Sequence, residues 1–86
     1  MMVDVVEVRP LGGYRLFLRF EDGVEGEVDV SRLIPFEGVF ALLRDTTRFA
    51  EVCLLRDLGT VGWPNGADLD PDVLYAKVTG KPAKAV

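Results

Sequence analysis

The side chains best suited to chemistry lie in one short segment, residues 63–71, which reads WPNGADLDP. Asp68 and Asp70 offer carboxylate oxygens, the ligands that Ca²⁺ and Mg²⁺ prefer in proteins. A calcium loop supplies about six to eight oxygens at ordered spacing and ends on a bidentate Glu. Because Pro71 begins a helix directly after Asp70, the segment offers too few oxygens, and we predict no metal site.

A structural role explains the same segment better. An Asp followed by Pro is typical of a helix start, where the Asp side chain accepts a bond from an early helix amide and Pro occupies the first turn. The Asn65–Gly66 pair is typical of a turn, and the Asp68 side chain is expected to bond loop amides. Turn and capping roles are therefore assigned to Gly66, Asp68, Asp70 and Pro71.

Other reactive groups offer less. The chain has no His, which removes the commonest general base and every Ser-His or Cys-His pair. Cys53 lies in an apolar run with no His or Lys near it in sequence, so we expect a buried structural thiol. Glu25, Glu27 and Asp29 share one face of a predicted strand, where solvated carboxylates are more common than acid–base pairs. The sequence thus predicts no catalytic residue and no cofactor.

Large aromatic side chains are better candidates for function, because rigid aromatics anchor protein interfaces. Trp63 is the only tryptophan; it stands beside a turn and suits either the core or an interface. Phe17 is predicted to face away from Leu16 and Leu18 on its strand. The candidate interaction residues are Trp63, Pro64, Asn65, Phe17 and Tyr75.

Strands are needed to position these residues. Residues 14–20 alternate apolar and polar side chains, which is typical of a half-buried strand. Asp22–Gly23 predicts a tight turn into a second strand over 24–30, and across this hairpin Arg15 and Arg19 can pair with the acids. The remaining predicted strands cover residues 3–9, 52–57 and 60–63.

A short helix is predicted over residues 38–45. Its apolar face packs on the sheet, and Asp45 or Thr46 can cap a further turn that carries Phe49. The residues on that apolar face are Val39, Phe40, Leu42 and Leu43.

A last helix is predicted to begin at Pro71 and to end at Gly80, since Gly favours the C-cap position. Together these elements predict an α+β fold. We expect an antiparallel sheet of about four or five strands, with roughly two or three short helices packed on one face.

Length and composition limit the class of protein. The 86 residues suffice for one small domain, which we place at residues 1–80, followed by a flexible basic tail over 81–86. The single Cys excludes an internal disulfide. Since no run of residues resembles a signal core or a membrane span, we expect a cytoplasmic protein. The net charge of −4 argues against direct nucleic-acid binding.

Several of these segments together resemble a known family. Residues 14–23, 28–30 and 62–71 and the Leu74–Tyr75 pair are similar to the bacterial family called domain of unknown function 2442, over nearly the whole chain. The resemblance implies a small α+β protein without an established activity, and it supplies no catalytic residues. Some members of that family carry a helix-turn-helix domain after this one, and others look like partners of a neighbouring small protein in toxin–antitoxin-type gene pairs.

The leading interpretation is a protein-interaction module, the antitoxin-like or regulatory member of a small bacterial operon. Its partner would be a second copy or the product of a neighbouring gene. The hydrophobic content of 49% and the mean hydropathy of +0.20 are high for a small domain, and open sheets have edges that need covering. Two other classes remain open: a small enzyme or metal-dependent hydrolase using the Asp68/Asp70 loop, and a regulator that binds DNA through its basic tail or a partner.

Overall fold

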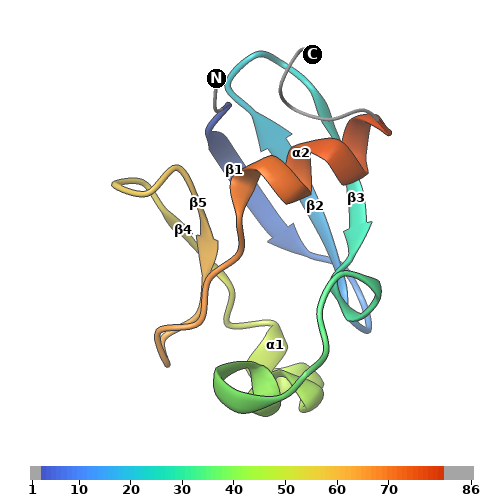
Figure 1. Cartoon of the computed structure of the whole chain (residues 1–86), viewed down its shortest axis with the longest axis vertical. Coiled ribbons are helices and arrows are strands. Elements are labelled where there is room, and N and C mark those ends of the chain that lie inside the picture. The colour runs from blue at the N-terminus through green and yellow to red at the C-terminus, as the bar shows by residue number, and fades with distance from the viewer. Residues whose placement is uncertain (1–2, 81–86) are drawn as a thin grey trace.

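The computed structural model describes residues 3–80, so the predicted tail over 81–86 lies outside the described part. Three strands are followed by two 3-10 helices, a short α-helix, a hairpin and a final α-helix (Figure 1). The elements are β1 (Val5–Pro10), β2 (Arg15–Phe20), β3 (Glu25–Asp29), η1 (Val30–Arg32), η2 (Gly38–Arg44), α1 (Thr46–Phe49), β4 (Cys53–Leu55), β5 (Thr60–Gly62) and α2 (Pro71–Thr79). Across residues 3–80, every helix is too short or too polar to span a membrane.

The main sheet is an antiparallel meander in the order β1-β2-β3. Its second turn is the predicted Asp–Gly turn: Gly23 adopts a φ of 91°, and the Asp22 carboxylate accepts a bond from the Val24 amide at 3.0 Å. The period of two along β2 places its apolar side chains in the core, as expected for a strand with one buried face. The buried residues of β2 are Leu16, Leu18 and Phe20.

The opposite face of this sheet is charged and half-exposed. Arg15 contacts Glu27 at 3.2 Å and Arg19 contacts Glu25 at 3.4 Å, which confirms the predicted pairing across the hairpin. These side chains are between 44% and 57% exposed. Exposed ion pairs contribute only about 0–1 kcal/mol each to the free energy of unfolding. These pairs therefore add little to the stability of the sheet.

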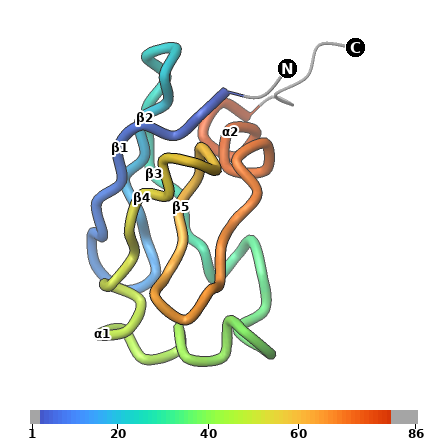
Figure 2. Tube along the Cα trace, turned by 90° about the vertical axis from the view of Figure 1, so that its left-hand side faces the viewer, coloured from blue at the N-terminus to red at the C-terminus, as the bar shows by residue number. Residues whose placement is uncertain are grey.

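β4 and β5 form a separate two-stranded antiparallel sheet. The prediction of one sheet with about four or five strands was therefore wrong, since the main sheet has three. The hairpin lies alongside β1 (Figure 2) and meets it at the turn, where the Val5 amide donates to the Gly59 carbonyl at 2.9 Å. Near this contact the β1–β2 ladder has a register shift between Val5 and Glu7, the irregularity that a β-bulge produces.

α2 lies across the inner face of the main sheet (Figure 1). Its start confirms the predicted cap: the Asp70 carboxylate accepts a bond from the Asp72 amide at 2.9 Å, and Pro71 is the first helical residue. The helix ends at Gly80, which has a φ of 72°. Leu74, on the sheet-facing side, is fully buried.

Close contact between α2 and β3 depends on Gly26. A Cβ at this position would lie 2.9 Å from Cγ1 of Val78, closer than two carbon atoms pack. The missing side chain therefore lets the last turn of α2 rest directly on the backbone of β3.

Residues 38–44 form a 3-10 helix, and this changes which side chains reach the core. In a 3-10 helix, side chains three residues apart eclipse one another. Val39 and Leu42 therefore share an outer face, where they are 51% and 58% exposed, while Leu43 is buried at 1%. The prediction of one apolar face packed on the sheet was wrong, because it assumed the wider period of an α-helix.

η2 and α1 lie beyond one end of the main sheet (Figure 1). The prediction that the helices share one face of the sheet thus applies to α2 alone. The predicted turn around Phe49 is confirmed: the Asp45 carboxylate accepts a bond from the Thr47 amide at 2.9 Å, and Phe49 is buried. Its ring lies 5.5 Å from that of Tyr14 and 5.6 Å from that of Trp63. Phe49 therefore joins η2 and α1, which we call the end layer, to the main sheet.

Candidate functional site

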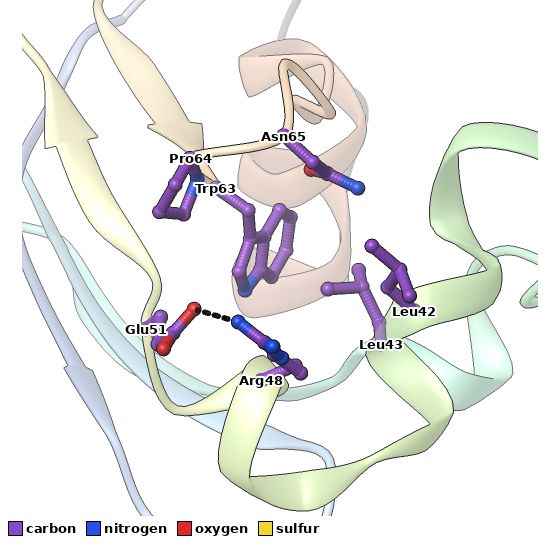
Figure 3. Close-up of a pocket in the computed structure, with 7 residues that line it drawn as sticks. All are labelled: Leu42, Leu43, Arg48, Glu51, Trp63, Pro64 and Asn65. Carbon is purple, nitrogen blue, oxygen red and sulfur yellow. Dashed lines mark ion pairs between the residues drawn. The ribbon is translucent and has the colours of Figure 1, made fainter.

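A pocket of about 240 Å³ opens between η2, α1 and the turn after β5. Figure 3 shows its lining side chains converging from these three segments. The pocket is largely apolar, with two opposite charges on one side. Its lining residues are Leu42, Leu43, Arg48, Glu51, Trp63, Pro64 and Asn65.

Trp63 forms a fixed wall of this pocket. The indole N–H donates to the Phe49 carbonyl at 2.8 Å, and the side chain is only 4% exposed. The sequence left Trp63 open as a core residue or an interface anchor. In the structure it is a core residue, and part of its ring lines the pocket.

Asn65 ties the turn after β5 to η2. Its amide nitrogen donates to the Val39 carbonyl at 2.9 Å, and its side-chain oxygen accepts a bond from the Ala67 amide at 3.2 Å. Within residues 3–80 the Asp68 side chain accepts no bond from a loop amide, contrary to the prediction, and Asn65 bonds the Ala67 amide instead. Because both ends of the Asn65 amide are used, the exposed Pro64 is held in place beside the pocket.

The open side of the pocket combines apolar and charged groups. Leu42 is 58% exposed and lies beside Leu43, which is buried. Across the pocket, Arg48 contacts Glu51 at 3.7 Å, and these side chains are 60% and 45% exposed (Figure 3). The pocket can enclose an apolar side chain and orient polar groups that flank it. Among its lining residues the ionisable side chains are Arg48 and Glu51, which are paired with each other.

The two remaining interaction candidates lie elsewhere. Phe17 is on the charged face of the main sheet, with the Arg9 guanidinium 4.4 Å above the centre of its ring. Tyr75 is on α2, and its hydroxyl donates to the Asp22 carboxylate at 2.5 Å. This bond lowers the pKa of Asp22, helped by the Val24 amide, and it raises the pKa of Tyr75.

The other polar groups give no reactive site. Gly66 occupies the predicted turn with a φ of 93°. Within the described part of the chain, no three or more Cys, Asp or Glu side chains gather where they could hold a metal ion. Cys53 is exposed, contrary to expectation, and its thiol donates to the Gly62 carbonyl at 3.5 Å. The apolar run that contains it forms β4, whose residues are exposed or half-buried, whereas the residues of β5 are buried.

Sequence reasoning found Trp63, Pro64 and Asn65 but missed the side of the pocket formed by η2 and α1. A signal for Leu42 was present: Gly38 and Asp45 leave room for only a short helix, and short helices often take the 3-10 form. Arg48 and Glu51 carried no such signal, because only the tertiary fold brings them opposite Trp63.

Comparison with known proteins gives one finding. The model of a family described as "Protein of unknown function (DUF2442)" matches residues 5–80. No curated protein and no solved structure matches the chain significantly.

Proposed function

The chain belongs to the family of unknown function DUF2442, and on this premise we propose that it is a protein-interaction module that binds its partner at the pocket beside Trp63. One observation carries the proposal: a rigid tryptophan lines an apolar pocket next to Leu42, a leucine that is 58% exposed. Interfaces concentrate their binding energy where an aromatic residue and apolar neighbours are enclosed by a polar rim.

The geometry favours binding over catalysis. A pocket of about 240 Å³ has room for one large side chain of a partner, whereas small-molecule sites are usually about 300–1,000 Å³. Val39 extends the apolar surface along η2, since it eclipses Leu42 and is 51% exposed. Leaving two aliphatic side chains this exposed beside a pocket is typical of a contact surface.

We take the partner to be the product of an adjacent gene. The chain would then be the regulatory or antitoxin-like member of a small bacterial operon. The role in an operon is supported by the family resemblance in the sequence. The pocket supports only the assignment as a protein-interaction module.

The test compares two matched leucines. Leu42 borders the pocket and Leu58 lies in the β4–β5 turn, and both are 58% exposed. Leu42→Ser and Leu58→Ser therefore remove similar exposed apolar area at different places. Sedimentation of each variant, alone and mixed with the neighbouring gene product, measures association at micromolar concentration.

We expect Leu42→Ser to weaken association by at least about tenfold, since a central interface side chain is worth about 2 kcal/mol or more, and Leu58→Ser to leave it unchanged. Equal losses in both variants would contradict the assignment of the pocket. A wild-type protein that stays monomeric both alone and in the mixture would contradict the interaction module itself.

A further inference from the structure

Among residues 3–80, no segment pairs with the outer edge of β3. This strand is the last in the order β1-β2-β3, so only its β2 side is hydrogen-bonded within the sheet. The Val30 amide bonds the Tyr14 carbonyl at 2.8 Å, and the Phe20 amide bonds the Val24 carbonyl at 2.8 Å. Because antiparallel pairs alternate in this way, the even-numbered residues of β3 face β2. The amides and carbonyls of Glu25 and Glu27 therefore point outward, to the free edge.

Charge alternates in sign from strand to strand toward this edge. Arg19 on β2 contacts Glu7 on β1 at 2.9 Å and Glu25 on β3 at 3.4 Å. Arg15 on β2 contacts Glu27 on β3 at 3.2 Å. The row Glu7, Arg19, Glu25 thus reads negative, positive, negative. In the row of Glu27 the residue opposite on β2 is Phe17, and Glu27 pairs diagonally with Arg15. In both rows the last strand presents a carboxylate.

These two carboxylates have unused capacity. The ion pairs join Arg19 to Oε1 of Glu25 and Arg15 to Oε1 of Glu27, and the two glutamate side chains are 50% and 57% exposed. A carboxylate accepts bonds at both oxygens. Within residues 3–80, both glutamates are therefore accessible to a further donor.

We propose that the free edge of β3 docks an extended segment of a partner protein that carries Lys or Arg at every second residue. Such a segment would add a fourth strand, with its backbone paired to Glu25 and Glu27. Side chains directly opposite on neighbouring strands lie about 5 Å apart, so its basic residues would meet the two carboxylates and continue the alternation of sign.

A second copy of this chain does not suit the edge. Pairing β3 with another β3 would set glutamates opposite glutamates, and like charges directly opposite are destabilising. Charges at a sheet edge also serve to repel strands in general. The two roles differ in outcome: an edge that is only protected pairs with no added strand, whereas the proposed edge pairs with a basic one.

This inference does not depend on the proposed function. The pocket is built from η2, α1 and the turn after β5, and none of its lining residues belongs to β3. Either surface can fail its test while the other stands.

The probe is a short end-blocked peptide in which lysine alternates with valine, added to the full chain. A peptide in which glutamate alternates with valine is the control. Amide hydrogen exchange gives the direct readout: we expect binding of the lysine peptide to protect the amides of Glu25 and Glu27. The amides of Gly26 and Val28 face β2 and are expected to be protected already.

A pair of double variants separates local pairing from overall charge. Glu25→Gln with Glu27→Gln removes the two edge charges. Glu37→Gln with Asp57→Asn removes two exposed charges away from β3. We expect the first double variant to bind the lysine peptide about fivefold more weakly, as two cross-strand charge pairs allow, and the second to change affinity less than about twofold.

Three results with the lysine peptide would overturn the proposal. The first is that the lysine peptide does not bind, and the second is that it binds without protecting the Glu25 and Glu27 amides. The third is an equal loss of affinity in the two double variants, which would mean that net charge alone attracts the peptide. Self-association of the wild-type chain that protects the same two amides would assign the edge to a second copy and would also overturn it.

Discussion

Asp22 and Tyr75 join the β2–β3 turn to α2 through one hydrogen bond whose strength depends on pH. The bond from the Tyr75 hydroxyl lowers the pKa of Asp22 below its ordinary 3.8. It raises the pKa of Tyr75 above its ordinary 10.0. A carboxylate with a lowered pKa stabilises the fold above its unfolded pKa, and this contribution is lost as pH falls through the folded pKa.

Tyr75→Phe should therefore make unfolding less dependent on acid. Between about pH 5 and pH 2, the free energy of unfolding of the wild type should fall more than that of Tyr75→Phe, as measured with urea. Tyr14→Phe is the matched control, because the Tyr14 hydroxyl donates to the Arg44 carbonyl, which does not titrate. Parallel acid curves for Tyr75→Phe and the wild type would contradict the role of this bond. At alkaline pH the sign reverses for Tyr75: its contribution is full below pH 10.0 and is lost as pH rises through its raised pKa.

The two aspartates before α2 differ in role although both are exposed. Asp70→Ala removes the bond to the Asp72 amide and should cost about 0.5–2 kcal/mol of unfolding free energy. Asp68→Ala removes no hydrogen bond of the described structure and should stay within about 0.5 kcal/mol of the wild type. Urea unfolding of the two variants side by side checks this, and equal losses would show that Asp70 does not cap the helix.

Among the elements, the packing of α2 on β3 is most sensitive at Gly26. Gly26→Ala places a Cβ within 2.9 Å of Val78 and should destabilise the fold by about 1–3 kcal/mol, as overpacking does. Val78→Ala makes room, so the double variant should lose less than the sum of the two single losses. Strict additivity in urea unfolding would mean that Gly26 and Val78 do not compete for this space.

The elements also show what sequence patterns can and cannot predict. Local signals were reliable: the Asp–Gly turn at Gly23, the caps at Asp45 and Asp70, and the alternation along β2 all depend on neighbouring residues. Two features depended on more. The 3-10 form of η2 exposes Val39 and Leu42, which were predicted to pack on the sheet, since apolar residues at this spacing also fit an α-helix. The division into two sheets depends on how the hairpin packs beside β1, which no local pattern of residues encodes.

The whole molecule is longer than it is wide, with extents of 36 × 24 × 22 Å. The end layer of η2 and α1 lengthens it, because these helices extend the sheet at one end instead of covering its open face (Figure 1). A seam results, with hollows of about 240 Å³ and about 180 Å³ that both include residues of η2. Half of the pocket could be predicted, since its residues 63–65 form a conspicuous motif. The other half could not be predicted from the sequence. Residues 63–65 reach η2 only after the chain has passed through α1 and the small hairpin, so the contact depends on the tertiary structure.

The position of Trp63, held by its bond to the Phe49 carbonyl at the wall of the pocket, affects the fluorescence of the protein. As the only tryptophan in the chain, Trp63 dominates the intrinsic fluorescence. Its ring is shielded from water except where it lines the pocket, so emission should be blue-shifted in the native protein and only weakly quenched by iodide. A side chain that fills the pocket would change that emission. The protein therefore carries its own fluorophore at the surface where we place its partner, and occupancy can be followed without attaching a dye.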